Sequence, residues 1–255
     1  MNFTIRPFKF QIMETFNKND HQTAAITDIN RREFLKRGVM IGAFTGVAGL
    51  SLVTACKEEG EGGVGPSEDL MREHGVLNRI MLIYDTCRIH LANGEQFPLV
   101  ILKNSAQIIR NFIEDYHEKL EEDFLFPLFE KATQLTVLVQ VLSVQHKAGR
   151  ILTDRIIESG KMNSWPGPEE SQKLIRLLND FNSMYRPHEA REDTVLFPAL
   201  RKIVSTNEYL ALGEKFEDKE QALFGKDGFG TVVEKVAGIE QQLGIYELSK
   251  FTPGA

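Results

Sequence analysis

Apolar residues recur at spacings of three and four through four long stretches of this chain, with short segments rich in Gly and Pro between them. In the first stretch the series runs from Leu70 through Leu77 to Leu91. Residues at this spacing share one face of an α-helix. The pattern therefore predicts four amphipathic helices that bury one face each against a common core.

Residues typical of helix ends mark the predicted boundaries. Ser67, followed by two acidic residues, is typical of a helix N-cap. Asn93-Gly94 indicates the end of this first helix, and Pro98 suits the first turn of the second. The segment 165–168, Trp-Pro-Gly-Pro, predicts the turn before the fourth helix.

Two prolines fall inside predicted helices. We expect Pro127 to interrupt the second helix, because proline lacks the backbone N–H that a helix interior uses. Pro187 stands directly before His188 in the fourth helix. There we expect a kink or bulge that turns the imidazole of His188 inward.

One segment of the second helix recurs in the fourth. Residues 117–127 read HEKLEEDFLFP, and residues 188–198 read HEAREDTVLFP. A shorter echo precedes each copy, Glu73-His74 in the first half and Gln145-His146 in the second. This self-similarity predicts a duplicated pair of helices. In each copy, His and the Glu four residues later lie on one helical face, about one turn apart.

The repeat predicts a metal site. Helical bundles hold metal ions with imidazoles and carboxylates that project inward from several helices. This ligand set suits iron better than thiolate-preferring metals, with zinc or manganese as alternatives. If both glutamates bridge, each of two ions receives two imidazoles and two carboxylate oxygens. The expected ligands are His74, His117, Glu121, His146, His188 and Glu192.

Several neighbours of these residues have open roles. Glu118 and Glu189 point about 100° away from the ligand face, so we expect them to contact a ligand from outside or to lie at the surface. Tyr116 and Tyr185 are candidate hydrogen-bond donors to ligands, or packing residues. Gly149 either leaves space for a small ligand near His146 or allows close helix packing.

These residues resemble the hemerythrin-like HHE cation-binding family. The resemblance covers about residues 68–200 and rests on the six expected ligands and on the LFP that follows each repeat. It implies an all-α, up-down four-helix bundle that holds a non-haem di-iron centre, with the six residues as iron ligands.

Two positions depart from the oxygen-carrying members of that family. These carriers have a second His four residues after the first on the third helix, where this chain has Arg150. Their fourth-helix carboxylate is an Asp five residues after its His, whereas Glu192 follows His188 by four. The missing His opens a coordination position beside a cation. We therefore expect a di-iron protein that binds or reduces oxygen, peroxide or nitric oxide. A non-catalytic oxygen-binding, iron-binding or sensing module and a structural metal site are the alternatives.

The N-terminal region resembles an export signal. Residues 30–36, NRREFLK, are similar to a twin-arginine signal. The apolar run from Val39 to Val53 is about 15 residues, which is short for a membrane span and suits a signal peptide. It ends at Cys56, which resembles a lipoprotein processing site; an uncleaved anchor is the alternative. We expect an exported, membrane-anchored protein of the periplasm or cell surface.

Composition adds limits to this picture. The formal net charge is −6, and no basic patch predicts nucleic-acid binding. The two cysteines give no disulfide framework, and Cys87 is expected to be a buried helix residue. The sequence does not identify an electron donor. Residues 232–248 predict a final amphipathic helix. The expected parts are a signal peptide at 1–55, a lipidated Cys and tether at 56–66, the bundle at 67–204 and a helical extension at 205–255.

Overall fold

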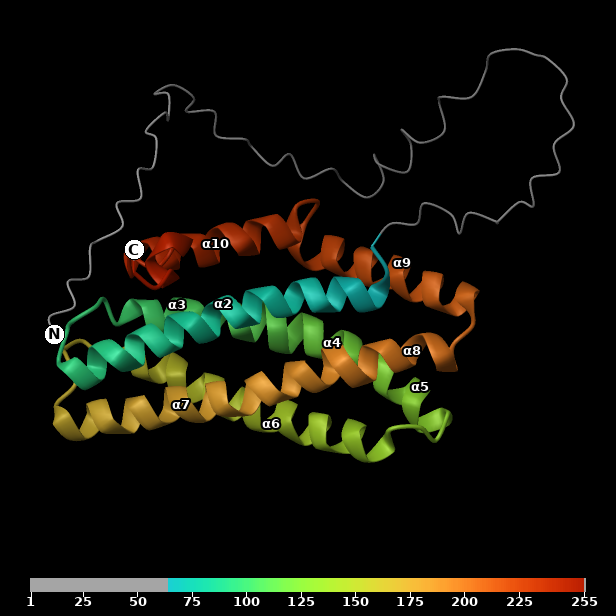
Figure 1. The fold of residues 1–255 in the computed structure, drawn as a ribbon, viewed down its shortest axis with the longest axis horizontal. Coiled ribbons are helices and arrows are strands. Elements are labelled where there is room, and N and C mark those ends of the chain that lie inside the picture. The colour runs from blue at the N-terminus through green and yellow to red at the C-terminus, as the bar shows by residue number, and fades with distance from the viewer. Residues whose placement is uncertain (1–63, 255) are drawn as a thin grey trace, which may run out of the picture.

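The computed structural model describes residues 64–254, and every regular element in that range is a helix. Four helical segments run up and down side by side, and two further helices lie along one side of them (Figure 1). The predicted all-α bundle with a C-terminal helical extension is confirmed. The twin-arginine segment, Cys56 and the tether as far as residue 63 lie outside the described residues.

The first segment is α2 (Pro66–Asn93). The predicted N-cap at Ser67 is wrong, because Gly65 precedes the helix and Pro66 occupies its first turn. Proline suits that turn, where a missing N–H costs no helical hydrogen bond. The predicted end is confirmed, since Gly94 follows the helix with a φ of 72°, in the left-handed region.

The second segment is a series of helical pieces without a break. Its members are α3 (Val100–Ile108), η1 (Ile109–His117), α4 (Glu118–Leu120), η2 (Glu121–Leu125) and α5 (Phe126–Lys131). Here η1 and η2 are π-helical, with hydrogen bonds five residues apart. The third segment is α6 (Thr136–Ser159), and the fourth comprises α7 (Pro168–Arg191), π-helical η3 (Glu192–Leu196) and α8 (Phe197–Ile203).

The two repeat copies share the same π turn. Phe126 N–H donates to the carbonyl of Glu121, and Phe197 N–H donates to that of Glu192. The prediction that Pro127 interrupts its helix is therefore wrong. Proline crowds the carbonyl four residues earlier and leaves it without a donor; the wider π turn accommodates this, and the helix continues to Lys131. Single π turns of this kind are frequent at functional sites.

At Pro187 the predicted bulge is also misplaced. The α-helical pattern of α7 continues through Pro187 to Arg191, and the π turn begins only at Glu192. Pro187 and Ser183, whose carbonyl the proline leaves without a donor, are both exposed. Water can satisfy that carbonyl, so the helix has no need to bulge at this point.

The extension consists of α9 (Thr206–Phe224), α10 (Gly228–Gln242) and a short 3₁₀ turn, η4 (Leu248–Phe251). The final helix thus overlaps most of the predicted range of 232–248, but it begins before residue 232 and ends before residue 248. A capping box between Ser205 and Glu208 starts α9. Buried Phe216 and Val236 pack these helices onto the bundle. Between residues 64 and 254, no helix combines the length and apolar character that a membrane span requires.

Candidate metal centre

The four segments each contribute one histidine to the middle of the bundle. His74 comes from α2, His117 from η1, His146 from α6 and His188 from α7. All four are buried, with no more than 4% of any side chain exposed. The ring centroids of His74 and His117 lie 4.7 Å apart, and those of His146 and His188 lie 5.0 Å apart. The histidines therefore form two pairs.

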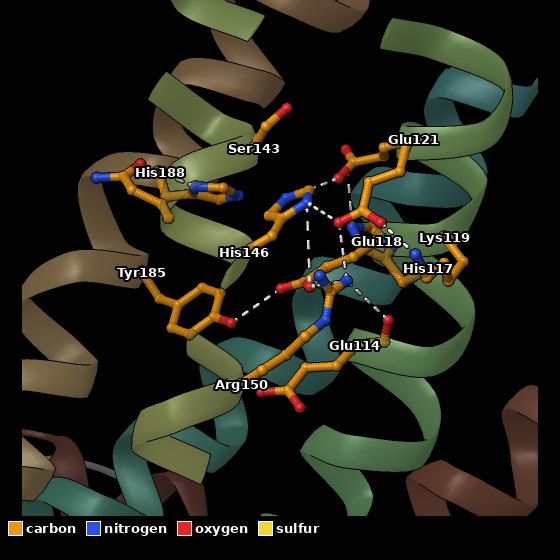
Figure 2. Close-up of polar contacts among 12 residues, drawn as sticks. Glu114, His117, Glu118, Lys119, Glu121, Ser143, His146, Arg150, Tyr185 and His188 are labelled. Carbon is orange, nitrogen blue, oxygen red and sulfur yellow. Dashed lines mark hydrogen bonds and ion pairs between the residues drawn. The ribbon is translucent and has the colours of Figure 1, made fainter. Parts of the chain in front are cut away.

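Glu121 extends between the two pairs. Its Oε1 lies 3.9 Å from Nε2 of His117, and its Oε2 lies 3.4 Å from Nε2 of His146. Figure 2 shows Glu121, His146 and His117 around the same interior space. A carboxylate placed in this way can give one oxygen to each of two cations.

Glu192 repeats this arrangement from the opposite side. Its Oε1 lies 3.1 Å from Nε2 of His188, and its Oε2 lies 3.4 Å from Nε2 of His74. We call the space beside His74 and His117 the His74 position, and the space beside His146 and His188 the His146 position. Each position faces two imidazole nitrogens and one oxygen from each glutamate.

The atoms at these positions fit a pair of cations. Ligand atoms of Glu121, His146, His188 and Glu192 all lie within 4.8 Å of one another, as do those of His74, His117 and Glu121. Both carboxylates are 0% exposed, and none of their four oxygens has a hydrogen-bond partner. Unpaired buried carboxylates are costly, and bound cations would compensate them. The structure thus brings all six expected ligands together in a set that can hold two ions.

The outward nitrogen of each of these four histidines has a hydrogen-bond partner that orients the ring. Such a partner fixes the proton on Nδ1 and leaves Nε2 free to coordinate. Sequence reasoning missed these partners, although each stands directly beside an expected ligand in the chain. The Nδ1 pairs are His74 with Asp193 Oδ1 at 2.7 Å, His117 with Glu73 Oε2 at 2.8 Å, His146 with Glu122 Oε1 at 3.0 Å, and His188 with Gln145 Oε1 at 3.0 Å.

Glu118 and Glu189 are buried rather than at the surface, so that alternative is wrong for both. Glu118 accepts from Tyr185 Oη at 2.9 Å and pairs with Arg150 at 2.8 Å, as Figure 2 shows. Glu189 accepts from the amide of Asn78 at 2.7 Å. These carboxylates form a polar layer around the six inward residues.

Both tyrosines are hydrogen-bond donors, but to acids around the site rather than to the six expected ligands. Tyr116 Oη donates to Glu73 at 3.0 Å, and Tyr185 Oη donates to Glu118. A Cβ at Gly149 would collide with the Tyr185 hydroxyl. Gly149 therefore makes room for Tyr185, and the alternative of space for a small ligand beside His146 is not supported.

Arg150 lies one helical turn after His146 on α6 and does not offer a further imidazole to the site. Its guanidinium pairs with Glu118 and Glu122, each at 2.8 Å. Glu118, Glu122 and His146 also form a group with metal-ligating atoms close together. Because Arg150 already supplies a positive charge there, this group does not form a further cation site.

The charges inside the site differ between the two bridging glutamates when no cation is bound. Burial and the neighbouring Glu192 raise the pKa of Glu121 well above its ordinary value. Burial also opposes ionisation of Glu192, but its contacts with His188 and His74 outweigh this and lower its pKa. Burial lowers the pKa of His117 well below the ordinary value. Cation binding must therefore displace protons from part of this set.

Comparisons with known proteins agree with this geometry. Residues 65–200 match the family model described as Hemerythrin HHE cation binding domain. Proteins of Mycobacterium bovis and Mycobacterium tuberculosis, both described as uncharacterized, are 50% identical to this chain over 186 residues, which is 73% of the chain and 73% of each relative. No solved structure gives a significant match.

Proposed function

Because the chain belongs to the hemerythrin HHE cation-binding domain family, we propose that its two positions hold a pair of non-haem iron ions. We propose further that the protein uses them to bind or reduce a small ligand, namely oxygen, peroxide or nitric oxide. The observation that carries the proposal is the placement of Glu121 and Glu192, each with one oxygen directed to either histidine pair.

The donor set supports iron over the alternatives. Imidazole and carboxylate ligands suit iron, whereas thiolate would favour zinc or copper(I). Cys87 is the described cysteine, and it is buried in α2 away from the six inward residues. A pair of iron ions would supply a redox-active centre with positions open to a small ligand.

The surrounding residues support reduction more than reversible carriage. Arg150 is held by Glu118 and Glu122, so the His146 position has two imidazoles rather than three. Both oxygens of Glu118 face donors, the Tyr185 hydroxyl and the Arg150 guanidinium, which favours the ionised form of this carboxyl. The pair keeps Arg150 in place as a cation beside the His146 position.

The test is consumption of peroxide and of nitric oxide by the full-length, metal-loaded and pre-reduced protein. Rapid consumption should disappear in Glu121→Ala and Glu192→Ala and persist in Glu214→Ala, because Glu214 lies exposed on α9. A ferric centre that stays inert with all of these ligands would contradict the proposal.

A structural metal site is the second candidate, and the burial of the six residues favours it. A tightly held, redox-silent zinc ion would be its signature. Reversible spectral change on cycling oxygen, without turnover, would instead favour an oxygen-binding or sensing module. The same metal-loaded preparation answers both questions.

We also propose that the protein is exported and anchored to a membrane through lipid on Cys56. The support is the sequence alone, in which Arg31-Arg32 and a short apolar run precede Cys56. Replacing both arginines by lysine should retain the protein in the cytoplasm, and Cys56→Ser should release exported protein from the membrane fraction. Unchanged fractionation of both variants would contradict this.

A further inference from the structure

The two cation positions are repeat-related but not electrically equivalent. At the His74 position, both Nδ1 partners are acids, Asp193 and Glu73. At the His146 position, one partner is the acid Glu122 and the other is the neutral amide of Gln145. Glu73 and Gln145 occupy equivalent places in the repeat, each directly before a histidine. The two halves of the repeat therefore share this hydrogen bond but differ in the charge of its acceptor.

The hydrogen bonds around Glu73 indicate its carboxylate form. One oxygen accepts from the Tyr116 hydroxyl at 3.0 Å, and the other faces Nδ1 of His117 at 2.8 Å. With Nε2 of His117 directed to a cation, Nδ1 carries the proton and donates it. Donors at both oxygens favour the ionised form, in which neither oxygen carries a proton.

A second repeat-related pair differs in the same sense. Asn78 and Arg150 each stand four residues after a lone histidine, and each hydrogen-bonds to the glutamate that follows a repeat histidine. Asn78, beside the His74 position, is neutral. Arg150, beside the His146 position, is positive and also pairs with Glu122, the carboxylate behind His146. Negative charge is thus greater around the His74 position and positive charge greater around the His146 position.

We propose that Glu73 makes the His74 position the tighter of the two cation sites and, when iron is bound, the one that is harder to reduce. A carboxylate that accepts from Nδ1–H increases the electron-donating strength of the imidazole. A stronger donor binds a divalent cation more tightly and favours the higher oxidation state of iron. Glu73 is a positioning and tuning residue that acts through His117. The iron part of this inference rests on the proposed function; the affinity part does not.

Zinc binding tests the affinity part directly. Two stepwise zinc affinities would be measured by chelator competition for the full-length protein and for Glu73→Gln and Gln145→Glu, which exchange the same two groups at repeat-related positions. Glu73→Gln should weaken the tighter step roughly 10- to 100-fold. Gln145→Glu should strengthen the weaker step. If Glu73→Gln changes only the weaker step or neither step, the inference is wrong.

Folding controls keep this result interpretable. The far-ultraviolet circular dichroism of each metal-free variant would be compared with that of the wild type. Should Glu73→Gln not fold, Gln145→Glu alone decides, because it must act on the weaker step. The double exchange, Glu73→Gln with Gln145→Glu, keeps the total charge and should restore two unequal steps; two equal steps would contradict the inference.

Binding of iron tests the predicted difference in reduction potential. It also separates this inference from the proposed di-iron function. In a reductive titration followed by electron paramagnetic resonance, the first electron should enter the His146 position. Glu73→Gln should then raise the midpoint potential of the second step, and Gln145→Glu should lower that of the first. The inference would be overturned if Glu73→Gln shifted the potential of the first step, if Gln145→Glu shifted that of the second, or if neither variant shifted a potential. A chain that binds two zinc ions but no iron would instead contradict the proposed function and leave the zinc result standing.

Discussion

The hydroxyl of Tyr185 lies over Gly149, in space that a Cβ at residue 149 would occupy. The two residues belong to adjacent helices, α7 and α6. Tyr185 is buried, and its hydroxyl donates to Glu118, which pairs with Arg150. The absence of a side chain at Gly149 thus allows a polar network to form beside His146.

Gly149→Ala should therefore destabilise the protein. The new methyl group would meet the hydroxyl and ring of a buried tyrosine that has little freedom to move. Overpacking of this kind costs about 1–3 kcal/mol. Urea denaturation of the metal-free protein would measure the loss.

Gly75→Ala is the matched control. Gly75 is exposed in the helix α2, and a Cβ there meets nothing within 4 Å. Alanine is favoured over glycine in a helix interior by about 0.5–1 kcal/mol, so this variant should gain stability. Equal effects of the two substitutions would contradict the packing role assigned to Gly149.

Glu121→Gln should change stability in opposite directions with and without cation. In the metal-free protein, Glu121 is a buried acid whose oxygens have no hydrogen-bond partner. Burial raises the pKa of this carboxyl, so folding at neutral pH opposes its ionisation, and a neutral amide avoids that cost and should stabilise the metal-free form. With cation present, the wild type gains binding free energy that the variant lacks. Thermal denaturation with and without added metal would measure both effects.

The opposite effects of Glu121→Gln with and without metal are expected only if Glu121 binds a cation. Glu214→Gln, at an exposed residue of α9, should leave stability unchanged in both conditions. If Glu121→Gln lowered the stability of the metal-free protein as much as that of the loaded protein, Glu121 would be a structural residue rather than a ligand.

Glu114 should make stability fall as pH rises. Burial raises the pKa of Glu114 from 4.5 to about 7, and bonds to Thr153 and Arg110 only partly oppose this. Between these values the folded protein keeps a proton that the unfolded chain has released, so the unfolded state binds fewer protons and stability decreases with pH. The loss is complete above about pH 7 and amounts to roughly 3 kcal/mol.

Glu114→Gln removes this titration. The difference in unfolding free energy between variant and wild type should move in favour of the variant from pH 4.5 to pH 8, because the amide never ionises. Denaturation of both proteins at the two pH values gives the measurement. A difference that is the same at both would show that Glu114 does not titrate in this range.

Arg150→His tests why this site would not carry oxygen reversibly. A histidine at residue 150 would lie about one helical turn after His146 and could supply a third imidazole to the His146 position. The variant should then show a reversible spectral change on cycling oxygen that the wild type lacks. Arg150→Gln, which removes the same ion pairs without adding an imidazole, is the control. If the glutamine variant behaves like the histidine variant, the missing ligand is not the explanation.

Much of this architecture could be predicted from the sequence. Helical spacing of apolar residues predicted the bundle, and the repeat predicted that His74, His117, His146 and His188 face one another. Both signals are local or periodic, so they survive without knowledge of the fold. The structure adds that Glu121 and Glu192 lie between the two histidine pairs.

The Nδ1 partners and the π turns were not predicted. Which nitrogen of His117 meets Glu73 depends on how α2 and η1 pack, a relationship between segments far apart in sequence. The π turns η2 and η3 lie just before Pro127 and Pro198, and local propensity represents such prolines only as breaks. Repeat-related comparison of Glu73 with Gln145 was nevertheless available in the sequence and would have indicated the asymmetry.

The central claim is that Glu121 and Glu192 together hold two cations between the histidine pairs. The most direct test is elemental analysis of the purified full-length protein, the two alanine variants and the exposed control Glu214→Ala. The account predicts two iron ions per chain in the wild type and control, and loss of both ions in Glu121→Ala and Glu192→Ala. A single zinc ion, or two iron ions that both alanine variants retain, would contradict it.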